Sequence, residues 1–507
     1  MSQKEQILKI LVLCIPALFF VFNPAKFPAD DGFFYPQIAY NFVQGNGMKF
    51  NDIYTTNGFH PLWMVFCVVA ECLNFFGKQN VIYILWVFQV FFLGLGFKLL
   101  TDIFFKNNLF SIFALGFLSL VFLSLGTIYL TEAHLNFLCL IVLLSFLAKN
   151  KKNEFIFGFL CSLVFLVRLD NVFIIAFLGL YFWKEKNYSI TSLSKMLISF
   201  SVLVLPYLFS NYYYFGDLVP ISGKVKSSFP DIQETMSLGY LPRIFFVITI
   251  FYLLLLFFKP TNYKPLKVYF ALGSLVFLFY NLVFQSQLGQ WYYVPQMILT
   301  SLLIYDLGLI LPFKIFDNKI LMYANMFVLA ILLSFIGYLK LSTNLSIAGN
   351  ILSSNSKIES KSEEIVETSI KEFSKVIPKD SRIYVYDFPG KFAFYSNFSV
   401  IPADGLVANK EYFNEMKPNN FRSFFNKNRI QYLLLPSYFK PNNGFSFIGI
   451  NIFGEKNDIT YYLKNSLEKK VIDTLWQKDL QAITSHQSPL KHLDPSYDSI
   501  KIFKLVE

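Results

Sequence analysis

The sequence predicts a polytopic α-helical membrane protein with about eleven membrane spans and a small C-terminal α/β domain. Of its 507 residues, 55% are hydrophobic and 19% aromatic while only 15% are charged, a composition far from that of ordinary soluble proteins. Apolar runs of spanning or near-spanning length recur up to about residue 340. After the last run the chain becomes a mixture of charged and polar residues with short hydrophobic runs, which indicates a soluble domain.

Eleven apolar segments are expected to cross the membrane, although several are shorter than the roughly 20 residues that a helical span needs. They lie at about 7–22, 81–104, 109–126, 133–148, 154–168, 171–183, 196–213, 241–258, 267–284, 291–311 and 320–340. The first resembles a signal peptide, but no small-x-small cleavage site follows it, so we expect an uncleaved span. The apolar stretch 61–76 is interpreted as a dipping or juxtamembrane helix, because a further span there would reverse the polarity of every later loop.

The basic residues set the expected orientation. With Lys9 on the cytoplasmic side, the basic loops at 149–152, 184–186, 259–267 and 314–319 all fall on that side, as the positive-inside rule requires. The N-terminus is therefore predicted to be cytoplasmic. The polar turns between the other helix ends then share the outer side, together with the C-terminal domain.

Three segments divide the chain. Residues 1–344 form the expected transmembrane module, with a first outer loop at 23–60; residues 345–360 form a Ser/Asn/Lys-rich linker, and residues 361–507 form the soluble domain. In this domain, 361–377 has the apolar stripe of a helix, and 382–387, 432–436 and 499–503 have the pattern of strands. The domain contains no glycine-rich phosphate loop, zinc-ligand spacing or nucleophile elbow, so we expect no independent catalytic site there.

Charge and cysteine content exclude two classes of site. The formal net charge is +11, and 23 basic but only 15 acidic residues precede Leu345. This excess belongs to short loops that orient helices, so it gives no support for nucleic-acid binding. The five cysteines all lie in apolar stretches with spacings that do not suggest a metal site, and they are interpreted as small core residues.

The strongest candidate site lies in the first outer loop. Adjacent Asp30 and Asp31 begin a stretch in which Phe34, Ile38 and Phe42 recur every fourth residue, as on the apolar face of a helix that lies in the membrane interface. An Asp at a helix start can cap the free N–H groups of the first turn, but only one of the two can occupy the cap position. Since capping leaves the other carboxylate unexplained, the pair is interpreted as functional.

Further charged and aromatic side chains are predicted on the same outer side. Each has an ordinary alternative: a solvated hairpin for Glu132 beside His134, mutual pairing for Arg168 and Asp170, lipid headgroup binding for the cations, and depth anchoring for the His and Trp. The candidates are Tyr35, His60, Glu132, Arg168, Asp170, Lys224, Lys226, Arg243 and Trp291. Carboxylates, cations and aromatics together suit a reaction on a lipid-linked phosphate, in which a carboxylate deprotonates an acceptor hydroxyl and cations take up charge on the departing phosphate.

Five motifs in order carry a resemblance. Asp30-Asp31 followed by Gly58-Phe-His60-Pro61-Leu62-Trp63 resembles the first outer loop of the GT-C superfamily of polyprenyl-phosphate-sugar-dependent glycosyltransferases, in particular the bacterial branch that includes the mycobacterial terminal arabinofuranosyltransferase. The turn at 131–133, the segment 168–170, the segment 214–226 and the stretch 395–407 resemble later motifs of that branch. Here Leu169 stands where the branch has Pro, and Tyr-Leu-Thr precedes Glu132 in place of Gly-Met.

The resemblance implies an activity. It implies a metal-independent, inverting transfer of a sugar from an undecaprenyl- or decaprenyl-phosphate donor to a glycan, lipid or protein hydroxyl, with no cofactor, at the periplasmic face of a bacterial inner membrane. Asp30 or Asp31 is the expected base, Lys224, Lys226, Arg168, Arg243 and His60 are expected to bind the donor phosphate or lipid, and Glu132, Asp170, Tyr35 and Trp291 to position sugar or acceptor. The soluble domain is expected to help recognise the acceptor.

Two alternatives stay open from the sequence. A flippase or transporter of a lipid-linked saccharide would also need cations and aromatics in a membrane cavity, but such proteins tend to show pseudo-symmetric halves and helices broken at mid-membrane, and neither feature is seen. A noncatalytic membrane-anchored assembly factor would not need eleven spans with polar outer turns.

Overall fold

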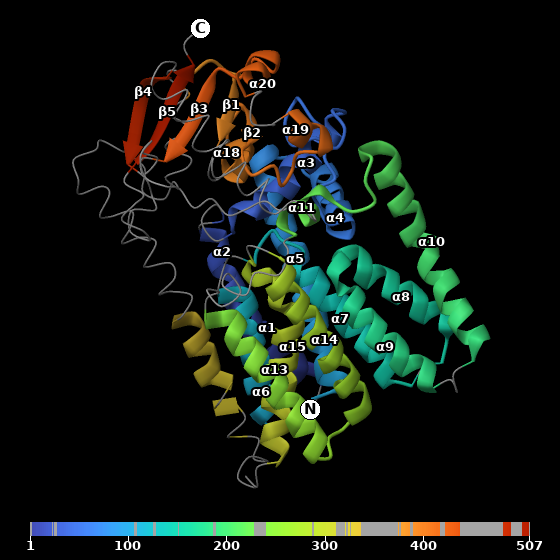
Figure 1. The fold of residues 1–507 in the computed structure, drawn as a ribbon. Coiled ribbons are helices and arrows are strands. Elements are labelled where there is room, and N and C mark those ends of the chain that lie inside the picture. Colours follow the sequence, from blue (N-terminus) through green and yellow to red (C-terminus); the bar gives the residue numbers. More distant parts are fainter. Residues whose placement is uncertain are drawn as a thin grey trace.

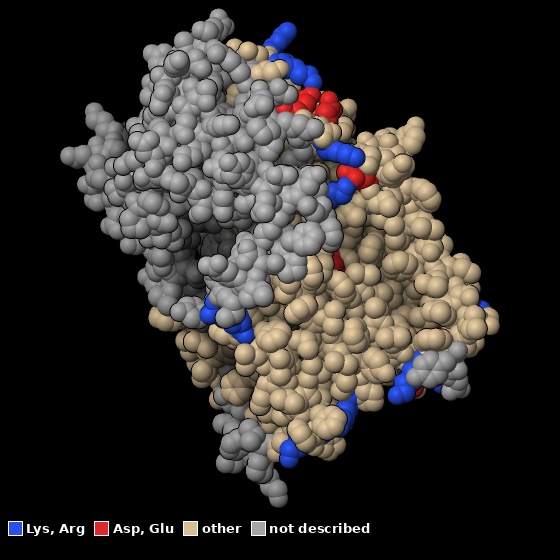
Figure 2. Space-filling model, in the orientation of Figure 1, with Lys and Arg blue, Asp and Glu red and all other residues tan. Residues whose placement is uncertain are grey.

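The structure is a computed structural model, and it places a helical bundle beneath a five-stranded sheet built from the C-terminal part of the chain (Figure 1). It describes residues 3–22, 24, 28–105, 109–124, 128–150, 152–185, 189–227, 240–285, 288–310, 320, 323–324, 326–335, 374, 377–385, 389–415, 421–436, 480–487 and 499–505. Figure 2 shows that the described surface of the helical part is largely uncharged, with Lys and Arg side chains along its lower rim. This is the surface that a membrane protein needs, because a charge in the hydrocarbon layer is costly.

Within the described residues, five helices are long and apolar enough to cross a membrane, so the prediction of a multi-pass membrane protein is confirmed. These five are α5 (Val81–Ile103), α10 (Ile190–Phe215), α13 (Tyr240–Phe258), α14 (Lys264–Phe284) and α15 (Val294–Ile310), of which α5 and α15 continue from short 3₁₀ turns. Other predicted spans form shorter apolar helices: α1 (Gln3–Cys14) with α2 (Leu18–Phe22), α6 (Leu109–Ser119), α7 (Ala133–Ala148), α8 (Glu154–Val167) and α9 (Val172–Glu185). The count of eleven crossings stays a prediction.

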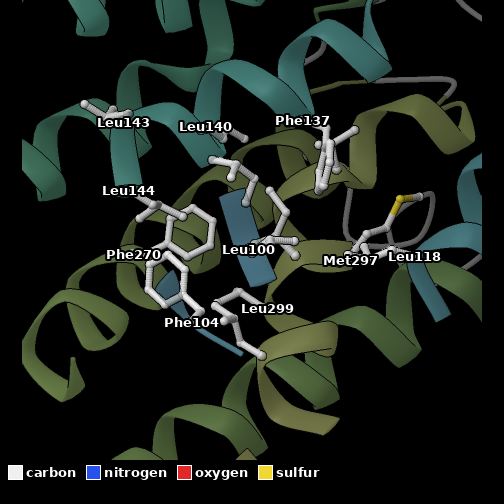
Figure 3. Packing of buried hydrophobic residues seen from close by; sticks show 14 of the residues in the cluster. Leu100, Phe104, Leu118, Phe137, Leu140, Leu143, Leu144, Phe270, Met297 and Leu299 are labelled. Carbon is white, nitrogen blue, oxygen red and sulfur yellow. The ribbon is translucent and has the colours of Figure 1, made fainter. Parts of the chain in front are cut away.

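The bundle core is formed by apolar side chains from helices far apart in the sequence. Figure 3 shows Leu100 of α5, Phe137 and Leu140 of α7, Phe270 of α14 and Leu299 of α15 packed together, all essentially inaccessible to solvent. Because lipid is as apolar as these side chains, tight packing rather than the hydrophobic effect holds such helices together. Gly308 of α15 illustrates how tight the packing is, since a Cβ atom there would lie 2.0 Å from the ring of Phe110.

One buried ion pair crosses the bundle. Lys267 of α14 donates to both carboxylate oxygens of Asp306 in α15 at 2.8 Å, and the Tyr252 hydroxyl of α13 donates to the same carboxylate at 2.7 Å. The sequence counted Lys267 among the loop cations, whereas the structure buries it. The pairing satisfies both charges, which explains how they are tolerated inside the bundle.

The first outer loop packs on protein. After η2 (Asp30–Phe33), α3 (Phe34–Val43) forms where the sequence predicts a helix, and it ends before Gly45, whose φ of +82° suits glycine. Phe34 and Ile38 are buried in a cluster with residues of the C-terminal sheet, while Phe42 is 42% exposed. The expectation that this apolar face lies in the membrane interface was therefore wrong. The adjoining α4 (Pro61–Cys72) is a 12-residue helix at the position of the predicted juxtamembrane helix.

The sheet is mixed, with the strand order β2-β1-β3-β5-β4. β1 (Arg382–Val385) pairs in parallel with β2 (Ser399–Pro402) and β3 (Tyr432–Pro436), and β3 pairs antiparallel with β5 (Ser499–Leu505), which pairs antiparallel with β4 (Leu480–Gln487). The three predicted strands are thus confirmed, and β2 and β4 are additional. Short helices α18 (Pro389–Tyr395), α19 (Lys410–Glu415) and α20 (Phe421–Lys427) accompany them. The helix predicted at 361–377 lies almost entirely outside the described residues.

Polar contacts join the first outer loop to the C-terminal part. Arg382 donates to Asp52 at 2.9 and 2.6 Å, and the Tyr54 hydroxyl donates to Glu415 at 2.6 Å. Lys78, at the start of the segment that leads into α5, donates to the carbonyl of Ala393 at 2.9 Å. These contacts tie the C-terminal part to the first outer loop and to the segment before α5, and α18 also packs on α3 (Figure 1).

Candidate active site

A cavity of about 350 Å³ lies between the first outer loop and the helix ends beneath it. Eight of the eleven site residues predicted from the sequence line its wall: Asp31, Tyr35, His60, Glu132, Arg168, Asp170, Lys226 and Trp291. They come from segments that lie up to 260 positions apart in the chain, counting from Asp31 to Trp291. The folded chain therefore gathers most of the predicted groups at one place.

Arg168 holds the acidic side of the cavity together. It ends α8 in an extended conformation, and its guanidinium donates to Glu132 Oε1 at 2.5 Å and to both oxygens of Asp170 at 3.0 and 2.7 Å. Its guanidinium carbon also lies 4.0 Å from the ring centre of Tyr292. Because Arg168 is only 1% exposed, these contacts supply the charge compensation and hydrogen bonds that water cannot. The pairing that the sequence offered as an alternative for Arg168 and Asp170 is present.

Glu132 is fixed from several sides. The Tyr35 hydroxyl donates to its Oε2 atom at 3.2 Å, and His60 Nε2 lies 3.7 Å from its Oε1 atom. The turn before it is held by Gln89 of α5, which accepts from the Leu130 N–H at 3.1 Å and donates to the Thr131 carbonyl at 2.9 Å. This turn places Glu132 toward the cavity.

His134 differs from its predicted neighbour. It is fully buried and packs against the rings of Phe122 and Tyr129, at centroid distances of 5.4 and 5.5 Å, and it does not line the cavity. The sequence pair Glu132 and His134 is therefore split: one side chain faces the cavity and the other lies in the bundle core.

Asp31 and Lys226 form the opposite pole. Lys226, in α11 (Ile221–Lys226), donates from Nζ to Asp31 Oδ2 at 3.2 Å, and its Nζ lies 5.8 Å from the ring centre of Tyr292. Burial alone would lower the pKa of Lys226, but the nearby Tyr292 and Asp31 groups raise that pKa above its usual value. Lys226 is thus a cation, and Tyr292 stands between it and Arg168.

Asp30, the neighbour of Asp31, lies outside the cavity and contacts α18 (Pro389–Tyr395). Its Oδ2 accepts from the Gly390 N–H at 2.9 Å and its Oδ1 from the Lys391 N–H at 2.8 Å. Burial raises the pKa of Asp30 to about 8, and the two backbone hydrogen bonds oppose that rise. One Asp of the pair therefore does bind helix N–H groups, but those of α18 near the C-terminal sheet rather than those of its own helix.

Three candidates for binding the donor phosphate, Lys224, Arg243 and His60, supply no positive charge to the cavity wall. Lys224 pairs with Asp217, and Arg243 is exposed in α13; neither lines the cavity. His60 lines it, but burial, and secondarily the charge of Arg168, lower the pKa of His60 to about 3, so it is neutral at physiological pH. Among the residues that the structure describes, the positive charges on the cavity wall are those of Arg168 and Lys226.

Two of the wall residues that the sequence did not single out are Tyr292 and Leu406. Tyr292, in η6 (Gln290–Tyr293), contacts both cations, and its signal was the run of aromatics at the start of a predicted span. Leu406 follows β2 and reaches the cavity because Gly58 lies against its backbone; a Cβ atom on Gly58 would be 2.1 Å from the Leu406 carbonyl oxygen. No group of three His, Cys, Asp or Glu side chains in the described part of the chain is arranged to hold a metal ion.

No protein-family model and no curated protein sequence matches this chain. Its fold does match solved structures. The crystal structure of ArnT from Cupriavidus metallidurans bound to undecaprenyl phosphate aligns with a TM-score of 0.51 and 10% sequence identity over 99% of this chain and 98% of ArnT, as does the apo form. The cryo-EM structure of the arabinofuranosyltransferase AftD from Mycobacteria aligns with 100% of this chain and 40% of its own, at 12% identity and a TM-score of 0.48, too low to support a shared fold. The resemblance that the motifs predict is therefore confirmed for the fold alone, through the match to ArnT.

Proposed function

We propose that this protein is an integral membrane glycosyltransferase that moves a sugar from a polyprenyl-phosphate donor to a hydroxyl acceptor. The observation that supports this most is the cavity in which a carboxylate, Asp31, pairs with the buried cation Lys226, while the ring of Tyr292 lies between Lys226 and a second buried cation, Arg168. The fold agrees, since the matching structure of ArnT holds undecaprenyl phosphate. The reaction takes place on the outer face of a bacterial inner membrane. This side follows from the positive-inside rule, because the basic loops lie at the opposite ends of the helices and are assigned to the cytoplasm.

Asp31 is the proposed general base. It takes the proton of the acceptor hydroxyl, whose oxygen attacks the anomeric carbon of the donor sugar, and the bond between that carbon and the phosphate oxygen breaks. The products are the glycosylated acceptor, with inverted anomeric configuration, and the polyprenyl phosphate. Asp30 is not suited to this role because both of its oxygens are already engaged by α18.

Lys226 stabilises the departing phosphate. Negative charge grows on the phosphate oxygen as the glycosidic bond breaks, and a fixed cation in a buried site stabilises that charge strongly. Arg168 contributes its charge to the same region but is held by Glu132 and Asp170, so it positions these carboxylates. In this proposal Glu132 and Asp170 accept hydrogen bonds from sugar hydroxyls, and Tyr35 and Trp291 contact the faces of the sugar.

The test measures release of polyprenyl phosphate from a panel of polyprenyl-phosphate sugars by the purified protein, with membrane extract as acceptor. Loss of a general base lowers turnover by roughly 10²–10⁴-fold, so the turnover of Asp31→Asn is expected to be lower than that of wild type by a factor in this range. The matched control is Asp102→Asn, because Asp102 is exposed at the other end of α5, about 30 Å from its start. Equal turnover by wild type and Asp31→Asn would contradict the role of Asp31.

A flippase would give a different result. It would move the labelled donor lipid across a vesicle membrane without releasing polyprenyl phosphate, and Asp31→Asn would change that movement alone. Release of polyprenyl phosphate that requires an added acceptor is the outcome that identifies a transferase.

A further inference from the structure

We propose that Asp30 is a positioning residue: its contact with α18 of the C-terminal part fixes the orientation of η2 and thereby aims Asp31 into the cavity. This inference rests on the proposed function and extends it, because it makes docking of the C-terminal part a requirement for turnover. It also gives the second carboxylate of the Asp pair a role of its own.

The contact is built from both sides. Asp30 accepts from two successive backbone N–H groups, those of Gly390 and Lys391. Gly390 is required for the approach, because a Cβ atom there would lie 2.3 Å from the Asp30 carbonyl oxygen and 3.1 Å from its Oδ2 atom. Phe33 of the same η2 segment packs on Phe394 of α18 at a ring distance of 5.5 Å. We call this set of contacts the η2–α18 clamp.

The other end of α18 is held as well. Lys78 donates to the Ala393 carbonyl, and its Nζ lies 5.4 Å from the ring centre of Phe394. The short α18 helix therefore has a carboxyl acceptor at its first N–H groups and a Lys donor on a carbonyl of its last turn, so both ends are held by hydrogen bonds. Both partners come from the part of the chain before residue 80.

The geometry of η2 links this clamp to Asp31. A 3₁₀ helix has about three residues per turn, so the side chains of Asp30 and Asp31 leave the axis about 120° apart. When one direction is fixed on α18, rotation of η2 is blocked and the other carboxylate is aimed at Lys226. On its opposite side η2 rests against the turn at 129–130, where a Cβ atom on Gly32 would lie 3.0 Å from the Tyr129 carbonyl oxygen. Loss of the clamp leaves η2 held by this contact and by the pairing of Asp31 with Lys226.

The test is a double-mutant cycle on turnover. Asp30→Ala removes the acceptor, and Gly390→Ala blocks the approach while leaving Asp30 unchanged. Since a displacement of about 1 Å in a reacting group can cost roughly 10²-fold, each variant is expected to lower kcat by about 10–100-fold with an almost unchanged KM for the donor. The combined variant is expected to match the single ones, because both remove one contact. Gly179→Ala is the control, as nothing lies within 4 Å of a Cβ atom there.

A second readout separates this inference from the proposed function. Hydrogen exchange at the Gly390 and Lys391 amides reports the clamp without turnover, and it is expected to accelerate in Asp30→Ala but not in Gly179→Ala. Faster exchange with wild-type kcat would overturn the positioning role while the transferase stands. Additive losses in the cycle, or loss of all activity in Asp30→Asn with normal kcat in Gly390→Ala, would make Asp30 the base instead. Faster exchange with no wild-type turnover of any donor would overturn the transferase and the positioning role together.

Discussion

Single side chains in this protein have roles that depend on their immediate neighbours. Asp30 and Asp31 are adjacent and chemically identical, yet one binds backbone N–H groups of α18 and the other pairs with Lys226 at the cavity. Arg168 likewise acts as a partner for two carboxylates rather than as an open phosphate ligand. The residue type gives the available chemistry, and the contacts decide which part of it is used.

The Arg168 network predicts a large effect on stability. Arg168→Met leaves Glu132 and Asp170 buried without their cation, and breaking a buried ion pair costs about 3–5 kcal/mol. The midpoint of thermal unfolding in detergent is therefore expected to fall by roughly 5 °C. The triple variant that adds Glu132→Gln and Asp170→Asn is expected to recover part of the loss. Arg243→Met, at an exposed site, is the control; a similar fall in both single variants would contradict the network.

At the scale of elements, the ends of helices and the turns between them build the site. The turn before α7 is a clear case, because Leu130 has a φ of +64°, which a residue with a branched side chain seldom adopts. Gln89 of α5 and Trp63 of α4 hold it: Trp63 donates to the Leu130 carbonyl at 2.9 Å. Two helices, α4 and α5, therefore support the backbone that carries Glu132.

Gln89→Leu tests this support. The substitution leaves the Leu130 N–H and the Thr131 carbonyl buried without their partner, and each unpaired group costs about 1–3 kcal/mol. We expect a lower unfolding midpoint and a roughly tenfold lower turnover, because Glu132 loses its fixed position. Leu130→Gly is the companion variant: it removes the strain at positive φ and is expected to keep activity. An unchanged midpoint in Gln89→Leu would show that the turn holds without α5.

At the scale of the whole molecule, the cavity lies where the helical bundle meets the C-terminal part. Leu406 belongs to its wall, and Asp52 and Tyr54 of the first outer loop bind Arg382 and Glu415. The C-terminal part is therefore built onto the site, and its docking and the shape of the cavity depend on each other.

The topology has a direct test. In a Cys72→Ser background, which removes the exposed native cysteine, Lys379→Cys beside the sheet is expected to react with a membrane-impermeant maleimide from outside intact cells. Lys184→Cys, exposed at the end of α9, is expected to react only after permeabilisation, since the basic loops are predicted to face the cytoplasm. Reaction of both from the same side would contradict the predicted orientation.

The sequence by itself determined the class of fold and singled out each Asp, Glu, Lys and Arg residue on the cavity wall in the described part of the chain. Helical spans follow from apolar length, and β1, β3 and β5 follow from apolar runs, because both signals are local. It missed β2 (Ser399–Pro402) and β4, whose sequence LQAITSHQ is largely polar. Charged groups at helix ends stood out because the membrane makes them costly, so eight of eleven predicted site residues line the cavity.

Only the tertiary structure decided which partner each group has. It put Phe34 and Ile38 against protein instead of lipid, split Asp30 from Asp31, buried Lys267 on Asp306, and brought Leu406 and Tyr292 to the cavity. These outcomes depend on contacts between residues far apart in the chain. An amphipathic pattern indicates that the apolar face of a helix must be covered, and a charged residue in an apolar segment indicates that its charge must be compensated. Neither specifies what covers or compensates it, because that depends on how the helices and the sheet pack together.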